Sequence, residues 1–237
     1  MNPRVSAIAL AVSTGALLFS SASQAALVAQ WDLTGQTGSQ VSSTALVLAS
    51  GITGGLMSRG AGLTSSAAAN SFSSTGWNGQ STDYLSLTLN VAAGSTLDLQ
   101  TLSVGTRSSN TGLGSIGLFY SGDGFTTAIT TITQPGTNFV NSAIDLTALA
   151  DVTGALEFRF YQIGTTAAGG GTSTAAGTFR LTDYFNGATD ENLSLTGTLS
   201  TASAVPVPAA AWLLVAGLGV MGAAVRRQRA AAGSTAG

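Results

Sequence analysis

The stretch Leu85-Ser86-Leu87-Thr88-Leu89-Asn90-Val91 decides the fold class. Its leucines and its valine occupy every second position, and small polar residues lie between them. Successive side chains of a β-strand point to opposite faces of the sheet. The pattern therefore predicts a strand with one buried face and one solvated face.

Shorter segments of the chain repeat this period of two: Val28–Leu33, Ile116–Tyr120, Leu156–Tyr161, Phe179–Leu181 and Leu193–Leu195. Leu97 and Leu99 share one phase, whereas Leu102 and Val104 share the other, which indicates a bulge or break near Gln100. Turn-forming residues separate the segments, at Gly122-Asp123-Gly124, Pro135-Gly136, Asn186-Gly187 and 167–174.

No amphipathic helix is predicted between residues 26 and 203. Eight to ten short strands joined by turns predict an all-β domain, an antiparallel β-sandwich of the jelly-roll kind, over residues 26–203. Residues 49–81 are rich in Gly, Ser, Ala and Asn, and they predict a long, loosely structured loop.

The composition excludes several kinds of function. The 237 residues include no cysteine, no histidine and no lysine, and the formal net charge is −2. Disulfides, thiolate chemistry, a Ser–His–Asp triad, a Schiff base and an ordinary zinc site are therefore ruled out. Four arginines lie in the middle of the chain without forming a basic run, so nucleic-acid binding is not expected.

Carboxylates are the remaining acid–base groups. Glycoside hydrolysis needs two of them, roughly 5–9 Å apart in a cleft. Glu157 and Glu191 are the only glutamates, and neither lies in a recognisable motif. We therefore expect no enzyme activity, and assign no catalytic and no cofactor-binding residue. Arg159, between Glu157 and Tyr161 on one strand face, is expected to be structural.

A calcium site is one possible exception. First and last strands of a jelly roll can lie side by side, so Asp32 and Asp183 could meet and supply hard oxygen ligands. Asp190, Glu191 and Ser121–Gly124 are further acidic positions, although the last falls short of a full calcium loop. The alternative is that these aspartates cap turns by accepting hydrogen bonds from nearby amides.

Sugar binding is a second possibility. Exposed aromatic rings can stack on pyranose rings, while polar side chains bind the hydroxyls. Trp77, in Thr75-Gly76-Trp77-Asn78-Gly79, is the best exposed candidate, followed by Tyr84 and then by Tyr161 and Tyr184. Trp31 lies between strand residues and is expected in the core. The alternative for every one of these rings is packing under a loop.

The two ends of the chain have the character of targeting segments. Residues 1–25 combine Arg4, an apolar run over Val5–Phe19 and small residues at Ser23 and Ala25, which predicts a signal peptide cleaved before Ala26. Near the other end, residues 205–225 carry no charge in 21 positions, which is enough for a helix of roughly 30 Å across a bilayer. Arginines at 226, 227 and 229 favour a cytoplasmic end there, which leaves residues 230–237 as a cytoplasmic tail.

The C-terminal segment 204–229 resembles a known sorting signal. Val205-Pro206-Val207-Pro208, the apolar run and Arg226, Arg227 and Arg229 follow one another as in the PEP-CTERM signal of Gram-negative bacteria, closest to its VPLPA variant. Val207 replaces the leucine of that variant. The resemblance implies an exosortase as partner, cleavage near Pro206–Pro208, and passage from an inner-membrane-anchored precursor to the cell surface or extracellular matrix. An ordinary membrane anchor and a buried apolar helix are the alternatives.

A second resemblance covers most of residues 27–199. The order of WDL, TRSSNTG, LFYSGDGF, LEFRFYQIG and GTFRLTDYFNG is similar to jelly-roll domains of bacterial surface proteins. It implies a fold akin to that of carbohydrate-binding modules. The sequence thus predicts an exported surface or matrix protein with a structural or adhesive role, in contact with exopolysaccharide. A carbohydrate-binding module with a defined glycan is the first alternative, and a small polysaccharide-active enzyme is the second.

Overall fold

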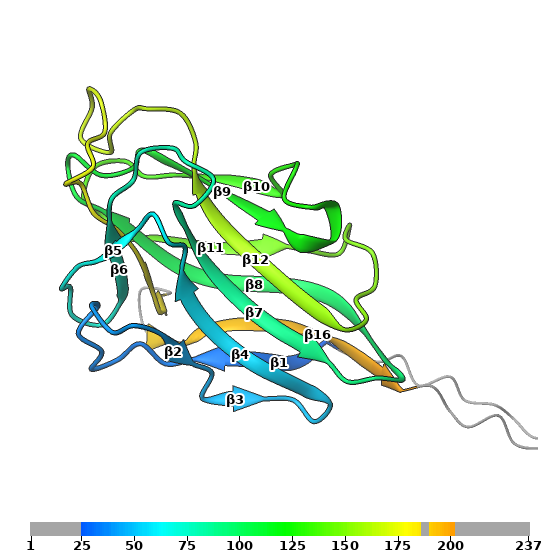
Figure 1. Ribbon diagram of the computed structural model, residues 1–237. Coiled ribbons are helices and arrows are strands. Elements are labelled where there is room, and N and C mark those ends of the chain that lie inside the picture. The colour runs from blue at the N-terminus through cyan, green and yellow to red at the C-terminus, as the bar shows by residue number, and fades with distance from the viewer. Residues whose placement is uncertain (1–24, 186–189, 202–237) are drawn as a thin grey trace, which may run out of the picture. The chain divides into compact units, whose positions relative to one another are not determined.

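The computed structural model describes residues 25–185 and 190–201, and they form two antiparallel sheets packed as a sandwich (Figure 1). The chain divides into two units, Met1–Ser200 and Thr201–Gly237, and the sandwich lies in the first. The predicted signal peptide, sorting segment and cytoplasmic tail lie outside the described residues, as does the turn at Asn186-Gly187. Among the described residues, no helix is long and apolar enough to cross a membrane.

The first sheet has the strand order β3 (Val47–Leu48), β1 (Ala26–Trp31), β16 (Leu193–Thr201), β8 (Ser95–Ser108), β13 (Phe179–Thr182), β6 (Phe72–Thr75) and β5 (Thr64–Ser65), and β11 (Val140–Asp145) also pairs with β8. The second sheet has the order β10 (Thr130–Thr133), β9 (Ser115–Tyr120), β12 (Ala155–Gln162), β7 (Tyr84–Val91), β4 (Ile52–Arg59) and β2 (Ser43–Thr44). A short pair, β14 (Tyr184–Phe185) and β15 (Asp190–Glu191), and one 3-10 turn, η1 (Ser121–Asp123), complete the described elements.

The alternation of apolar and polar residues along the strands builds the core, as predicted. In β7 every second residue from Leu85 to Val91 is buried, and in β12 Leu156, Phe158 and Phe160 are buried. These two strands pair antiparallel in the middle of the second sheet. Their apolar side chains pack against residues of the first sheet in a single hydrophobic cluster, which includes Trp31, Phe179 and Leu195. Trp31 is fully buried, as predicted.

The predicted phase change near Gln100 occurs inside one continuous strand. Gln100 and Thr101 in β8 are both partly exposed, and the buried positions change parity across them, from Leu97 and Leu99 to Leu102 and Val104. Pairing with β11 begins at Thr101. The change of phase therefore coincides with the point where β8 takes up this partner.

Residues 49–81 do not form the long loop that their composition predicts. They contain β4, β5 and β6, and they contribute Ile52, Met57 and Phe72 to the core. The alternation in β4 is interrupted by a bulge between Gly54 and Leu56, which conceals the strand pattern in the sequence. Gly55 in this bulge has φ +58°, and its carbonyl accepts a hydrogen bond from the Trp31 indole at 3.0 Å.

Arg59, at the end of β4, connects the two sheets. Its guanidinium donates to the carbonyl oxygens of Gly38, Gln40 and Ser73 and to the Ser74 hydroxyl, and it lies 3.7 Å from the centre of the Phe72 ring. Burial lowers the pKa of Arg59 to about 10, so the group still carries its charge at neutral pH. Because carbonyls replace water around it, this cation joins β4 to β6 and to the loop before β2.

Trp77 also contradicts the expectation of a loosely structured loop. It is only 2% exposed, its indole donates to the Ser74 carbonyl at 3.1 Å, and its ring packs edge-on against Phe179 with 5.6 Å between centroids. The prediction that Trp77 is exposed for glycan contact is therefore wrong. The Gly-rich flanks carry the chain into the core rather than away from it.

We expect Arg59→Met to destabilise the protein by about 2–4 kcal/mol, because several buried carbonyls lose their donor. Urea unfolding followed by fluorescence measures this as a lower midpoint with an unchanged slope. Arg107→Met, which removes a cation elsewhere on the surface, is the matched control and should destabilise the protein by about 0.5 kcal/mol at most. Equal stability of the two variants would contradict the role given to Arg59.

We expect Trp77→Ala to cost about 3–5 kcal/mol of folding stability, since it leaves a cavity beside Phe179. Trp77→Phe keeps an aromatic ring and should lose less. Thermal unfolding of the purified full-length chain distinguishes the two. A melting temperature unchanged in Trp77→Ala would show that this ring is not part of the core.

Candidate functional site

The solvent face of the second sheet carries a cluster of aromatic rings around one arginine. We call it the aromatic platform: Tyr84 of β7, Phe119 of β9, Phe125 after η1, and Arg159 and Tyr161 of β12. Phe158 and Phe160 of β12 face the core, so the residues between them face outward. Arg159 pairs in register with Phe119 on one side and Ser86 on the other, and Tyr161 pairs with Tyr84.

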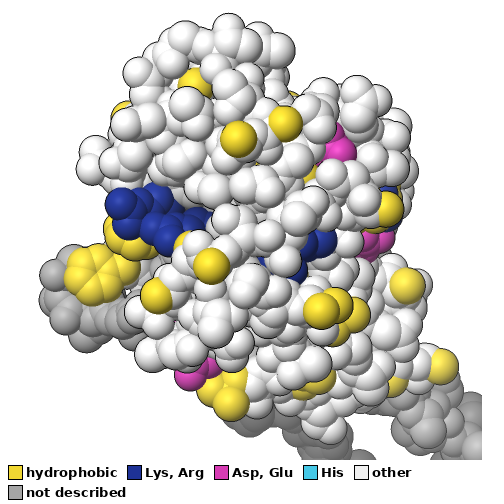
Figure 2. Space-filling view, turned by 60° about the vertical axis from the view of Figure 1, so that its left-hand side comes forward, with side chains coloured by type: hydrophobic (Ala, Val, Ile, Leu, Met, Phe, Trp, Pro, Cys, Tyr) yellow, Lys and Arg dark blue, Asp and Glu magenta, His cyan; other side chains and the backbone are white. Residues whose placement is uncertain are grey.

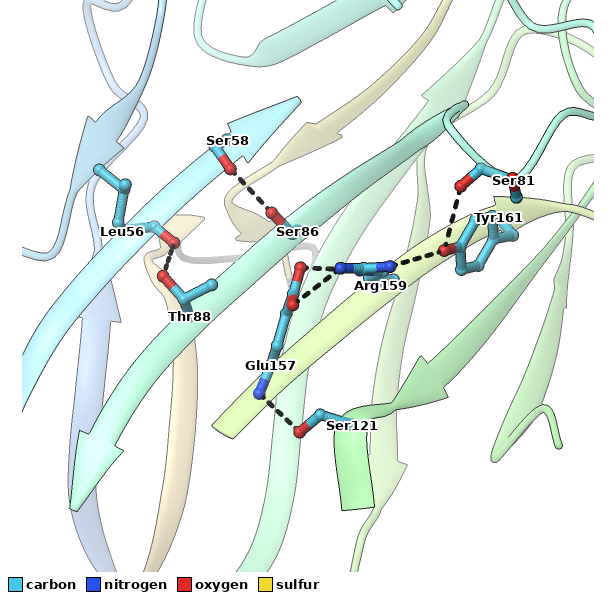
Figure 3. Close-up of polar contacts among 9 residues, drawn as sticks. All are labelled: Leu56, Ser58, Ser81, Ser86, Thr88, Ser121, Glu157, Arg159 and Tyr161. Atoms are coloured by element: carbon cyan, nitrogen blue, oxygen red, sulfur yellow. Dashed lines mark hydrogen bonds and ion pairs between the residues drawn. The ribbon is translucent and has the colours of Figure 1, made fainter. Parts of the chain in front are cut away.

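Arg159 organises the platform (Figure 3). Its guanidinium forms a two-point ion pair with Glu157, with Nε–Oε1 at 2.7 Å and a second nitrogen 3.0 Å from Oε2. The remaining nitrogen donates to the Tyr161 hydroxyl at 3.1 Å, and that hydroxyl faces the Ser81 carbonyl at 3.4 Å. The bond to Glu157 raises the pKa of Arg159 above its ordinary value, against desolvation. The arginine is thus charged and fixed in orientation.

The aromatic rings are fixed by contacts with one another and with the guanidinium. Arg159 lies 4.1 Å from the centroid of the Tyr84 ring and 4.0 Å from that of Phe125. Tyr161 contacts Tyr84 at 5.4 Å and Phe119 at 5.3 Å between ring centroids. These are the distances at which cation–π and aromatic pairs attract. The platform therefore holds its shape without a ligand.

Two glycines allow the rings to lie close to the sheet. A Cβ added at Gly60 would come within 2.7 Å of the Tyr84 ring, and one added at Gly117 would come within 2.7 Å of the Phe119 ring. Such contacts are too short for carbon atoms. Glycine at Gly117 therefore leaves room for the Phe119 ring, and glycine at Gly60 leaves room both for the Tyr84 ring and for the still closer Thr82 carbonyl oxygen.

Hydroxyl side chains continue from Arg159 across β7 to β4, although Ser86 among them is buried (Figure 3). Ser86 and Ser58 share a hydrogen bond of 2.8 Å, and the Thr88 hydroxyl donates to the Leu56 carbonyl at 3.2 Å. These strands pair in register at Ser58 and Ser86, so the hydroxyls follow on from Arg159 in one row across the sheet. Rings, a guanidinium and hydroxyls thus lie on one face.

The turn after η1 places Phe125 over the platform. Phe125 has φ +60°, an uncommon conformation for a side chain of this size, and its amide donates to the Tyr120 carbonyl at 3.0 Å. Asp123 supports this turn by accepting bonds from Thr126 and Thr127. Desolvation raises the pKa of Asp123, but these hydrogen bonds together outweigh it, so the pKa of Asp123 is lowered. A carboxyl group with a lowered pKa is the opposite of what a general acid requires.

The predicted sugar-contact residues divide between the platform and other places. Tyr84 and Tyr161 lie on the platform, whereas Trp77 is in the core and Tyr184 belongs to β14. Phe119 and Phe125 were missed. Phe119 lies between the buried Leu118 and the partly buried Tyr120, so strand parity could have placed it outward. Phe125 depends on a left-handed turn, which the sequence does not specify.

The two aspartates predicted to bind calcium lie near each other in the fold, since both accept hydrogen bonds from Thr34. The buried Asp183 carboxylate accepts hydrogen bonds from the Leu33 and Leu193 amides and from the Thr34 hydroxyl. Asp32 accepts one from the Thr34 amide at 2.8 Å. The Asp32 contact is that of the turn-capping alternative, whereas Asp183 joins the chain after β1 to the start of β16. Among the described residues no group of three or more acidic, His or Cys side chains is arranged for a metal, and calcium binding stays a prediction.

The two glutamates considered for hydrolysis have separate surroundings. Glu157 uses both carboxylate oxygens on Arg159, and Glu191 lies in β15, paired with β14. The Glu157 carboxylate thus belongs to the platform through its ion pair with Arg159.

In comparisons with known proteins, the chain shows only distant similarity to solved structures. No family model matches the sequence. No curated protein matches it either. Among solved structures, the chain is similar to a family 29 carbohydrate-binding module, with 14% identity, a TM-score of 0.37, and coverage of 74% of this chain and 89% of that one. It is also similar to a mutant of module CBM29-2 complexed with cellulohexaose, with 13% identity, a TM-score of 0.36, and coverage of 74% and 91%.

Proposed function

We propose that this protein is a non-catalytic carbohydrate-binding protein whose ligand lies across the aromatic platform. The observation that carries the proposal is the arrangement around Arg159, where three strands and one turn hold four aromatic side chains and a charged guanidinium on a solvent-facing sheet surface. Aromatic rings offer flat apolar surface to the C–H face of a sugar, and fixed polar groups beside them can bind hydroxyls.

Preorganisation supports this function. The platform residues are held by a two-point ion pair, ring contacts and closely fitting glycines, so little conformational entropy remains to be lost when a ligand binds. Glycan binding was the first alternative at the level of sequence, and the platform now favours it over a purely structural role.

We also propose that the protein acts outside the cytoplasm, at the cell surface or in an exopolysaccharide matrix. The support is the signal-peptide pattern of residues 1–25 and the resemblance of residues 204–229 to an exosortase sorting signal. Binding to polysaccharide gives an exported surface protein a direct adhesive role.

The platform is tested by binding of the full-length chain to a glycan array, followed by titration calorimetry with the neutral glycans that bind and with cellohexaose. We expect Tyr84→Ala and Tyr161→Ala to weaken binding at least about tenfold, or about 1.4 kcal/mol. Phe185→Ala removes an exposed ring outside the platform and should leave affinity unchanged. A folded protein that binds no glycan, or that loses affinity equally in all three variants, would contradict the proposal.

The sorting proposal is tested by intact mass and fractionation of the protein from its native host, with and without the exosortase. We expect a mature species that begins at Ala26 and ends near Pro206–Pro208 in the surface or secreted fraction. Loss of the exosortase should leave the longer form in the inner membrane. A chain that keeps residues 209–229 whatever the exosortase status would instead be an ordinary anchored protein.

A further inference from the structure

A second basic site lies on the first sheet, where two arginines oppose each other. Arg107 of β8 and Arg180 of β13 are direct partners in the antiparallel register. Phe179 and Leu181 on either side of Arg180 are buried, so both arginines face away from the core. The exposed ring of Phe139 lies beneath them, with its centroid 4.7 Å from the Arg107 guanidinium and 5.6 Å from that of Arg180.

These two arginines have no carboxylate partner in residues 25–185 and 190–201. The ion pair found there joins Arg159 to Glu157 instead. Arg107 donates one hydrogen bond, from Nε to the Thr137 carbonyl at 2.6 Å. Like charges directly opposite each other on paired strands are unfavourable. Burial, with a smaller effect from Arg107, also lowers the pKa of Arg180. The pair thus lowers stability unless an anion is bound between its members.

The surroundings of the pair form an open cleft of about 510 Å³. Besides Arg107 and Arg180 it is lined by small and polar residues, Ala67, Ala68, Ser108–Thr111, Thr137 and Thr178. None of these lining residues, all within the described part of the chain, is acidic. On the face that Figure 2 draws, basic side chains lie directly against hydrophobic ones, and the acidic side chains lie apart from the largest basic cluster. The cleft is within the size range of small-molecule sites.

The chemistry of the cleft matches an acidic sugar. A carboxylate fits the planar forks of two guanidinium groups, and hydroxyl and amide side chains can bind sugar hydroxyls. The Phe139 ring contacts both arginines and lines the neighbouring cleft, so it offers an apolar surface beside this one. Building on the proposed carbohydrate-binding function, we propose that Arg107, Arg180 and Phe139 bind a uronate unit of an acidic polysaccharide. This site is separate from the aromatic platform, which lies on the other sheet.

Overall charge does not explain such binding. The described residues carry four arginines against ten carboxylates, a formal charge of −6, so a polyanion is repelled at long range. Affinity for an acidic polymer then depends on this one local site. Single substitutions in it should consequently have large effects.

The test is affinity electrophoresis of the full-length chain through gels that contain polygalacturonate or alginate. Fully methyl-esterified polygalacturonate keeps the backbone and removes the charge. We expect the wild-type chain to be retarded by at least one of the acidic polymers and not by the ester. Arg107→Gln and Arg180→Gln should weaken retardation roughly tenfold to a hundredfold, since each loses a charge-assisted bond. Arg180→Lys keeps the positive charge but not the planar guanidinium, so its retardation should lie between that of the wild-type chain and that of Arg180→Gln.

The controls separate this site from the platform and from misfolding. Tyr84→Ala should keep its affinity for the acidic polymer, and Arg180→Gln should keep its affinity for neutral glycans. Because Arg180 is partly buried without an anion, Arg180→Gln should melt at the wild-type temperature or above it.

Each contrary result has a distinct meaning. If the protein binds neutral glycans but neither acidic polymer, this inference is overturned and the proposed function stands. If it binds no glycan at all, both are overturned. Retardation by the methyl ester, or equal retardation by dextran sulfate, would overturn recognition of a carboxylate.

Discussion

The antiparallel pairing of β7 with β12 is the constraint on which the rest of the structure depends. Phe158 and Phe160 must enter the core, and the residues next to them in sequence must therefore point to solvent. One strand thus supplies two of the largest core side chains and, from its other face, both Arg159 and Tyr161. Core and candidate site cannot be changed independently in this strand, since a shift of one residue in register would exchange them.

The four described arginines show how a chain without lysine uses its cations. Arg59 is surrounded by backbone carbonyls and holds the sheets together. Arg159 is neutralised by Glu157 and holds a set of rings in place. Arg107 and Arg180 face each other with no such neutralising group among the described residues. Arg59 and Arg159 therefore have structural partners, and the proposal of a ligand site rests on the other two arginines.

Many of the strands could be predicted from the alternation of apolar and polar residues alone. The strands around Leu87, Leu118, Phe158 and Leu195 were predicted because their apolar residues recur with period two, and the pairing of first and last strands was predicted with them. The strand β4 was missed because Gly54 and Gly55 form a bulge that breaks the period. Trp77 was misplaced because glycine-rich sequence is compatible both with a surface loop and with a close approach to the core.

The candidate site was predictable only in part, for a related reason. Strand parity alone is enough to place Glu157, Arg159 and Tyr161 on one face of β12. Parity cannot show that Phe119 and Phe125, distant in sequence, meet them, because that depends on the order of strands and on one left-handed turn. The pairing of Arg107 with Arg180 likewise depends on the register of β8 and β13, which local sequence does not encode.

The position of β16 between β1 and β8 has a mechanical consequence. A tether attached after Thr201 would transmit tension along the axis of this strand. Hydrogen bonds in an antiparallel ladder lie across the strands, so pulling along β16 loads many of them at once in shear. Peeling the same strand away from an edge would break them one after another. A domain anchored through this strand while holding a polymer would resist sudden drag far better than one anchored through an edge strand.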